Sequence, residues 1–225
     1  MFRGYACYGY HMVIAVIADI VGSRSLEDRA SAQRVLDETI TRVEADLPLA
    51  TQPLRPTVGD EQQAVYARLG DALTSLLMLQ LALPDGISFR FGIGVGAIRA
   101  IDSAHGDLSD GPGWYAARDA IETVHAREQR AVPRMRTWIV GAQGQDEVME
   151  SVIAASNAYL LARDELVGAM SERERRLTYG RLIGTPQAEL ARTEGITQPS
   201  VSKSLRSAGA AALIEGVAQM RGATS

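Results

Sequence analysis

The sequence predicts an α/β or α+β domain followed by a helical domain. Strand-like and helix-like segments alternate as far as about residue 142, whereas the segments from Asp146 onward all have helical periodicity. Gln143, Gly144 and Gln145, which lie between the two parts, have the composition of a linker. We therefore expect a domain of strands and helices over residues 12–142 and an all-helical domain over residues 146–225.

The expected elements follow one another in a regular order. An apolar, β-branched run predicts a buried strand at 13–18, and an alternating run predicts another at 89–96. The glycines of the second run indicate that something approaches its backbone closely. Gly59 and Asp60 look like a hairpin turn, and residues 100–113 look like a polar loop. The other expected strands are 55–58, 62–67 and 137–140, and the expected helices are 27–47, 70–83, 114–127, 148–170 and 172–183.

Composition narrows the class of protein. The chain has 225 residues, of which 46% are hydrophobic, and no apolar run approaches the roughly 20 residues of a membrane span. A single cysteine, Cys7, excludes an intramolecular disulfide, and no secretion signal is visible, so we expect a cytoplasmic protein. The net charge is −4, yet the segment from Ser171 onward carries eight basic against five acidic residues. A mildly basic end on an acidic body is compatible with a DNA-binding module.

Residues 185–208 have the pattern of a helix-turn-helix. Thr185 is expected to cap the first helix, with Pro186 in its first turn. Gly195 supplies the backbone freedom for the turn, after which Thr197 caps the second helix and Pro199 lies in its first turn. About twenty residues resemble bacterial repressor-type helix-turn-helix motifs, which usually bind DNA as dimers, so DNA and a homodimer are the expected partners.

The second helix of this motif is expected to bury Val201 and Leu205 and to expose polar side chains. Amide, hydroxyl and cationic groups are those that base edges and phosphates accept. The residues expected to contact DNA are Thr197, Gln198, Ser200, Ser202, Lys203 and Arg206. The alternative is a helical hairpin used only for packing or dimerisation.

Two carboxylates in the first part are candidates for a metal or phosphate site. Asp19 ends a buried strand, and Asp60 lies in a hairpin 41 residues later. With a backbone carbonyl such as that of Ile20, they would form a hard-oxygen site suited to Mg²⁺ or Mn²⁺ and a bound phosphate. Glu61 is expected to point to the face opposite Asp60. Taken singly, Asp19 is better explained as a helix cap and Asp60 as an ordinary turn residue.

Residues around these carboxylates complete the candidate ligand site. Gly22, Ser23 and Gly59 lie beside them and would leave room for an anion. Arg24 is expected either to contact phosphate or to pair with Asp60 in place of a metal.

Four segments resemble the class III nucleotide cyclases. Residues 18–23 (Ala-Asp-Ile-Val-Gly-Ser) and 57–61 (Thr-Val-Gly-Asp-Glu) resemble their two metal motifs. Residues 91–96 resemble their glycine-rich strand, and residues 115–118 resemble the helix that carries their transition-state arginine, here Arg118. The resemblance implies an α+β, ferredoxin-like domain over residues 12–142 with a nucleotide as ligand.

The same features, together with the helix-turn-helix, are similar to the SatD family over almost the whole chain. Its members pair Asp-Ile-Val-Gly-Ser-Arg with Gly-Asp-Glu-Gln/Phe-Gln, as residues 19–24 and 59–63 do here. Two departures from the cyclases argue against catalysis. Trp114 occupies the position of a cyclase asparagine, and the N-terminal domain has no lysine to recognise a base.

Three hypotheses follow from the sequence. The first is a DNA-binding transcriptional regulator whose cyclase-like domain binds a nucleotide or phosphate ligand. The second is a nucleotide cyclase or related metal-dependent phosphotransferase that uses Asp19, Asp60 and Arg118. The third is a dimerisation scaffold without a ligand. Trp114 disfavours the second hypothesis, and the paired carboxylates disfavour the third.

Overall fold

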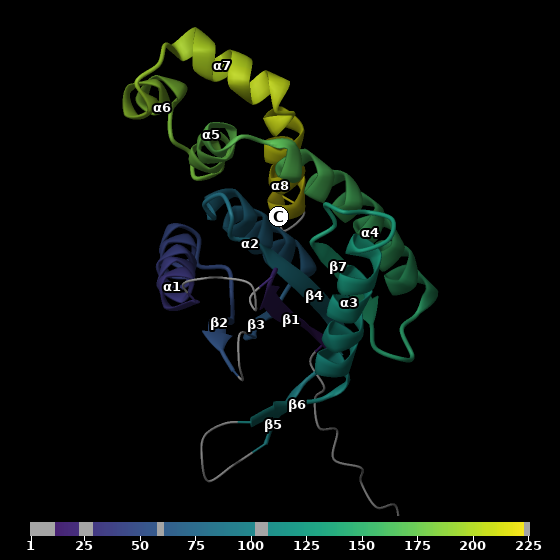
Figure 1. Cartoon of the computed structure of the whole chain (residues 1–225). Helices are drawn as coiled ribbons and strands as arrows, with labels where there is room; N and C mark the ends of the chain where they lie inside the picture. Colours follow the sequence, from purple (N-terminus) through teal and green to yellow (C-terminus); the bar gives the residue numbers. More distant parts are fainter. Residues whose placement is uncertain (1–11, 23–28, 58–60, 102–107, 223–225) are drawn as a thin grey trace, which may run out of the picture.

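The computed structural model describes residues 12–22, 29–57, 61–101 and 108–222 (Figure 1). Strands and helices alternate in the first part of the chain, in the order β1 (Met12–Ile20), α1 (Arg29–Asp46), β2 (Gln52–Pro56), β3 (Gln62–Tyr66), α2 (Leu69–Ala82), β4 (Phe89–Ala97), β5 (Arg99–Ile101), β6 (Leu108–Asp110), α3 (Pro112–Glu128) and β7 (Thr137–Gly141). Only helices follow, namely α4 (Glu147–Ala169), α5 (Glu172–Leu182), α6 (Gln187–Glu194), α7 (Gln198–Ser207) and α8 (Ala210–Gly222).

A five-stranded sheet of order β2-β3-β1-β4-β7 organises the first part. Its first four strands are antiparallel to their neighbours, and β7 runs parallel to β4. With α1 between β1 and β2, and α2 between β3 and β4, this is the β-α-β-β-α-β arrangement of ferredoxin-like folds, extended by α3 and β7. The mixed α+β fold expected from the sequence is confirmed.

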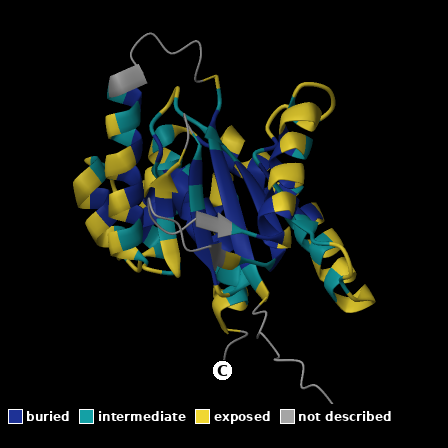
Figure 2. Ribbon diagram, turned by 90° about the horizontal axis from the view of Figure 1, so that it is seen from below, coloured by how far each residue is buried: buried dark blue, intermediate teal, exposed yellow. Residues whose placement is uncertain are grey.

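Alternate residues of β1 face the two layers of helices. Ile14 and Val16 pack in the core formed with α1 and α2, whereas Ala15 and Ile17 pack against α3. Figure 2 shows the strands buried at the centre of the molecule with exposed helical surface around them. Because helices cover both faces of the sheet, nearly every residue of β1 is apolar. This continuous apolar run is the pattern from which the strand was predicted.

The glycines of β4 allow α3 to approach the sheet. A Cβ atom on Gly92 would lie 2.2 Å from the carbonyl oxygen of Ala117, and one on Gly94 would lie 2.0 Å from that of Gly113. Neither position has space for a side chain. The close approach predicted from these glycines is therefore that of helix α3 to the strand.

Helix α4 covers the free edge of the sheet at β7. Asn157 accepts a hydrogen bond from the backbone N–H of Ile139 and donates one to its carbonyl, at 2.8 and 2.9 Å. Asp164 accepts from the backbone N–H groups of Arg136 and Thr137 at 2.7 and 2.8 Å. These side chains satisfy the backbone groups that an edge strand would otherwise leave unpaired.

Some of the helices after residue 146 pack in the same apolar core as the sheet of residues 12–142. Met170 before α5, Tyr179 of α5 and Leu213 of α8 belong to the same apolar cluster as the sheet and α2. A smaller cluster joins α5, α6, α7 and α8 around Leu177 and Val201. The apolar core therefore continues across the predicted boundary at 142–146, and the division into two domains stays a prediction.

Two sequence expectations differ from the fold. The predicted polar loop at 100–113 contains the short hairpin β5–β6 and the start of α3. Thr185 does not cap α6, because Pro186 occupies the N-cap position and offers no side-chain acceptor. Among the described residues, no helix has both the length and the hydropathy needed to cross a membrane.

Candidate functional site

Asp19 lies near the carboxyl end of β1, on the side of the sheet that faces α3. The strand register places it directly opposite Arg90 of β4, and Arg90 Nη1 lies 3.4 Å from Asp19 Oδ2. The same guanidinium donates from Nε to Glu128 of α3 at 2.6 Å. Arg90 thus links a strand carboxylate to a helix carboxylate, and 37% of the Asp19 side chain is exposed.

Glu61 and Arg118 form a second ion pair on this side of the sheet. Ala18 pairs with Gln62 in the register of β1 and β3, so continuing the ladder by one residue brings Asp19 opposite Glu61. Arg118 of α3 approaches Glu61 Oε2 at 2.6 Å. The hydrogen bond to Glu61 raises the pKa of Arg118, and the charges of Glu61, Glu122 and Asp19 act in the same direction.

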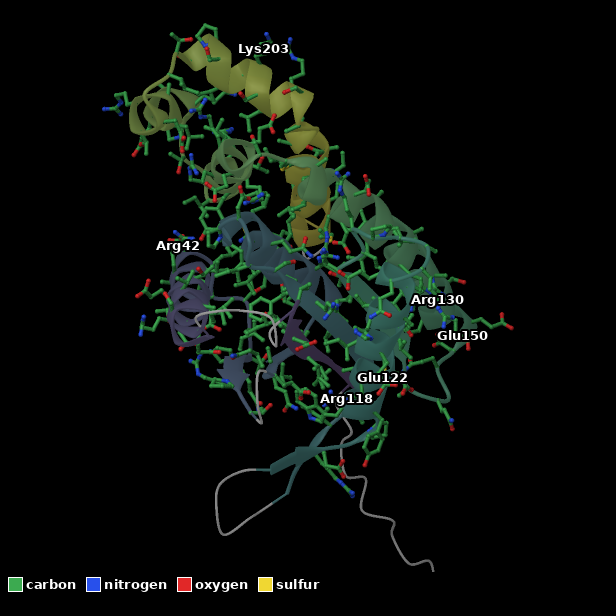
Figure 3. The ribbon with its side chains drawn as sticks, viewed as in Figure 1. Arg42, Arg118, Glu122, Arg130, Glu150 and Lys203 are labelled. Carbon is green, nitrogen blue, oxygen red and sulfur yellow. The ribbon has the colours of Figure 1, made fainter. Side chains whose placement is uncertain are left out.

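The result is a cluster of charged side chains from β1, β3, β4 and α3, hereafter the carboxylate–arginine cluster, which consists of Asp19, Glu61, Arg90, Arg118 and Glu128. Arg118 is its most exposed arginine, with 48% of its side chain accessible. A guanidinium in this position can bind a phosphate through paired N–H donors. Figure 3 shows Arg118 and Glu122 together on α3 at the lower end of the molecule.

The sequence predicted part of this site. Asp19 and Arg118 lie in the cluster, and Ile20 is the last residue of β1 beside Asp19. Gly22 has a φ of 69°, a conformation that favours glycine. Ser23, Arg24, Gly59 and Asp60 lie outside the described residues.

Sequence reasoning missed three members of the cluster. Glu61 was not counted among the site residues, but it pairs with Arg118. Arg90 and Glu128 were not singled out, although a charge between two phenylalanines in a predicted strand is a signal that it has a partner. The partner of Arg90 can be identified only when the pairing of β1 with β4 is known.

The metal site predicted at Asp19, Ile20 and Asp60 stays a prediction, because Asp60 lies outside the described residues. No three histidine, cysteine, aspartate or glutamate side chains among them are grouped as metal ligands would be. The carboxylates of Asp19 and Glu61 each contact an arginine instead.

Trp114 and Tyr115 have different environments at the start of α3. Trp114 is 8% exposed and packs with Ala15 and Ile17 of β1, so it is a core residue and not a base-stacking platform. Tyr115 is 61% exposed, and its hydroxyl donates to Asp110 at 2.7 Å. The cyclase asparagine position is thus filled by a side chain that faces the sheet.

The predicted helix-turn-helix is formed by α6, a tight turn and α7. Gly195 ends α6 in the left-handed conformation with a φ of 65°. The Thr197 hydroxyl accepts a hydrogen bond from the backbone N–H of Ser200 and so caps α7 as expected. Val201 and Leu205 are buried against α5 and α6. The local signals therefore predicted the turn and the cap of α7 correctly, although Thr185 does not cap α6.

The outward side of α7 carries most of the side chains expected there. Gln198, Ser200, Lys203 and Arg206 are exposed, whereas Ser202 is half-buried, contrary to expectation. Lys203 lies at the far end of the molecule from Arg118 (Figure 3). The carboxylate–arginine cluster and the exposed side of α7 are therefore two separate candidate sites.

Comparison with known proteins identifies the family. The model of the SatD family matches residues 13–215, which is nearly the whole chain. The chain belongs to the SatD family. A comparison with curated proteins gives no match.

Several solved structures are similar to this SatD-family chain at low identity. An adenylate cyclase from Trypanosoma brucei in its monomeric state is 16% identical, with 53% of this chain and 72% of that chain covered and a TM-score of 0.43. The guanylate cyclase domain of RhGC from Catenaria anguillulae, in complex with GTP, is 17% identical, with coverages of 51% and 74% and a TM-score of 0.41. The adenylyl cyclase CyaB from P. aeruginosa is 12% identical, with coverages of 53% and 81% and a TM-score of 0.35.

Proposed function

We propose that this chain is a transcriptional regulator that binds DNA through α7. The observation that carries the proposal is a difference between two helices: the arginines of α5 form ion pairs, whereas the cations of α7 do not. Arg173 and Arg176 of α5 pair with Glu194, and Arg175 pairs with Asp85. In contrast, Lys203 and Arg206 of α7 have no ion-pair partner among residues 12–22, 29–57, 61–101 and 108–222, and both are exposed.

Unpaired cations on an exposed recognition helix suit the phosphates of DNA. The binding free energy of such contacts comes largely from counterion release, so it falls steeply with salt. Gln198 and Ser200 at the start of α7 supply amide and hydroxyl groups for base edges in the major groove. Because α7 is held by α5 and α6, these groups would meet DNA in a fixed geometry.

The test is binding to the promoter of the protein's own gene, measured by fluorescence anisotropy at several salt concentrations. Replacing Lys203 and Arg206 together with alanine should abolish the salt-sensitive complex. Removing a single phosphate contact should reduce the slope of log K against log salt by about 0.9. Arg130→Ala removes an exposed cation from the loop after α3 and should leave binding unchanged. Undiminished binding by the double variant would refute the proposal.

We propose as a second function that the carboxylate–arginine cluster binds a nucleotide or another phosphate ligand, which would be the input of the regulator. The supporting observation is Arg118, which is half exposed beside the carboxylates of Asp19 and Glu61. A ligand phosphate would take the place of Glu61 on this guanidinium. Residues 23–24 and 59–60 flank the cluster in sequence and carry the remaining predicted ligand contacts.

Thermal unfolding with ATP or GTP, each with and without Mg²⁺ or Mn²⁺, tests the second function. A ligand at 100 times its dissociation constant should stabilise the fold by about 2.7 kcal/mol. Arg118→Ala should remove this shift, whereas Arg130→Ala should retain it. The comparison with and without the metal tests whether Asp19 and Asp60 hold one. Conversion of the triphosphate by concentrated protein with Mn²⁺ would favour the cyclase hypothesis instead.

A further inference from the structure

A cavity of about 310 Å³ lies where the sheet meets the helices that follow it. Four segments line this cavity: the end of α2 with the turn after it, the segment before β7, the C-terminal end of α4, and α5. Three arginines belong to its wall, namely Arg134, Arg136 and Arg175. We call this space the arginine cavity. No residue of the carboxylate–arginine cluster lines it, so it is a separate site.

Arg175 reaches from α5 to the turn after α2. Its Nη2 atom donates to Asp85 Oδ1 at 2.6 Å and to the carbonyl of Leu83 at 3.4 Å. Its Nη1 atom donates to the carbonyl of Met170 at 3.1 Å. The Arg175 side chain is mostly buried, whereas 72% of the Asp85 side chain is exposed. The guanidinium is therefore fixed in the wall of the cavity, and its carboxylate partner lies in solvent.

Arg136 supplies a second fixed guanidinium. Its Nε atom donates to the Ser88 hydroxyl at 3.0 Å, and its Nη1 atom donates to the carbonyls of Pro133 and Met135 at 3.0 and 2.8 Å. The same Nη1 atom lies 2.8 Å from a carboxylate oxygen of Glu128, which is mostly buried. Because these contacts hold the side chain in place, a ligand would bind without having to order it.

Arg134 is the most accessible of the three arginines, since about half of its side chain is exposed. Its stem lies over Gly168 of α4, where a Cβ atom would come within 2.9 Å of Arg134 Cδ. The guanidinium pairs with Glu165, whose side chain is 59% exposed. Exposed ion pairs contribute little to stability, so an incoming anion can replace Glu165 at small cost.

Two carboxylates also line the cavity, and neither prevents an anion from binding. Asp85 is exposed and, like Glu165, is an exchangeable partner of an arginine. Asp164 is already neutralised, because its Oδ1 atom accepts from Arg163 and its Oδ2 atom accepts from two backbone N–H groups. Arg163 and Asp164 are fully buried together. The cavity therefore presents mainly the positive charge of its arginines to a ligand.

We propose that the arginine cavity binds a small phosphomonoester through the arginines of its wall. Guanidinium groups bind phosphate through paired N–H donors. A phosphate group carries a charge of about −1.5 to −2, so one such group balances the loss of both Asp85 and Glu165 as partners. The volume of about 310 Å³ is at the lower end of the range for ligand pockets, and it leaves room for a small organic group beside the phosphate.

An occupant of the cavity would contact both parts of the chain. Arg134 and Arg136 precede the edge strand β7, whereas Arg175 belongs to α5, on which α6 and α7 pack. The ligand would therefore fasten α5 to the edge of the sheet and so hold the recognition helix more firmly. The effect on DNA rests on the proposed function, whereas the binding of the phosphomonoester does not.

Isothermal titration calorimetry of the full chain at constant ionic strength tests the site. An Arg118→Ala background removes the other proposed phosphate site. Inorganic phosphate should bind saturably, glycerol 3-phosphate should bind at least as tightly, and acetate should bind about tenfold more weakly, because it loses charge-assisted hydrogen bonds. Absence of saturable phosphate binding, equal affinity for acetate, or weaker binding of glycerol 3-phosphate than of phosphate would overturn the proposal.

Replacing an arginine of the wall should weaken the binding of phosphate. Arg134→Gln and Arg175→Gln should each raise the dissociation constant about tenfold, since each removes a charge-assisted contact. Arg130→Gln removes an exposed cation outside the cavity and should leave the constant unchanged. Arg134 lies at the surface, so its variant should fold normally, and an unchanged dissociation constant for Arg134→Gln would refute the site.

Replacing an exchangeable carboxylate should have the opposite effect. Asp85→Asn and Glu165→Gln each remove a group that competes with the ligand for an arginine, so phosphate should bind more tightly. Glu150→Gln neutralises an exposed acid in the first turn of α4 and should change nothing. An equal gain in the Glu150→Gln variant, or no gain in either of the other two, would contradict the proposal. These titrations contain no DNA, so their failure is distinguishable from a failure of DNA binding.

Discussion

The phenol of Tyr179 in α5 donates a 2.6 Å hydrogen bond to the carboxylate of Asp46 at the end of α1. The guanidinium of Arg42 lies over the same ring, 5.7 Å from its centroid. This contact joins the first helix of the α and β part to the helix that supports the helix-turn-helix. Burial, together with the hydrogen bond to Asp46, raises the pKa of Tyr179.

Replacing Tyr179 with phenylalanine should lower the free energy of unfolding by about 1 kcal/mol, because a part-buried hydrogen bond is removed without creating a cavity. Chemical denaturation measures the change. Tyr115→Phe removes a similar hydrogen bond, to Asp110 at 2.7 Å, from a side chain that is 61% exposed, and its effect should stay below about 0.5 kcal/mol. Equal effects for the two variants would contradict a structural role of the Tyr179 contact.

Tyr66 should make the fold sensitive to alkaline pH. Burial raises the pKa of its phenol to about 12, partly offset by the hydrogen bond to Ser75. The unfolded chain binds the proton less tightly, with a pKa of about 10. The stabilising contribution is therefore complete below pH 10 and is lost as pH rises from about 10 to about 12. Urea unfolding across this range should show a smaller decline for Tyr66→Phe than for the wild type, while a parallel decline would refute the assignment.

Gly94→Ala should destabilise the packing of α3 on β4. The new methyl group would lie 2.0 Å from the carbonyl oxygen of Gly113, so the helix must shift. Overpacking of this kind costs about 1–3 kcal/mol and should appear as a lower melting temperature. Gly222→Ala is the matched control, since nothing lies within 4 Å of its new methyl group. An unchanged Gly94→Ala variant would show that α3 does not lie where the structure has it.

Asp164→Ala should be the most damaging of these changes. The carboxylate accepts from two backbone N–H groups of the β7 segment, and it pairs with Arg163 at 2.7 Å, where both side chains are fully buried. Its removal leaves a buried guanidinium without its counterion, which costs about 3–5 kcal/mol. The neighbouring Glu165 pairs with Arg134 at the surface, so Glu165→Ala should change stability by less than about 1 kcal/mol. Urea denaturation would distinguish the two, and similar losses of stability would contradict the buried role of Asp164.

Local signals in the sequence predicted the helices whose ends carry capping residues or glycine. The capping box of Ser171 and Glu174 marks the start of α5, and Thr197 and Gly195 mark the turn of the helix-turn-helix. These features depend on residues within four positions of one another. The alternating apolar run of β4 is equally local, and it predicted the strand although not which element approaches its glycines.

Features that depend on strand register or on contacts between distant elements were not predictable. The position of Glu61 relative to Arg118 follows from the pairing of β1 with β3, on which a single sequence carries no information. The hairpin β5–β6 has strands of three residues each, too short for periodicity to identify. The polar residues on the inner side of α4, Asn157 and Asp164, look like surface residues until their partner backbone is known.

Asn157 and Asp164 also decide how the sheet ends. Both side chains bind backbone groups of β7 that a sixth strand would otherwise bind. To add a strand at this edge, another molecule would have to displace α4 and break the buried ion pair of Asp164 with Arg163. Growth of the sheet by strand addition is thereby blocked at this edge.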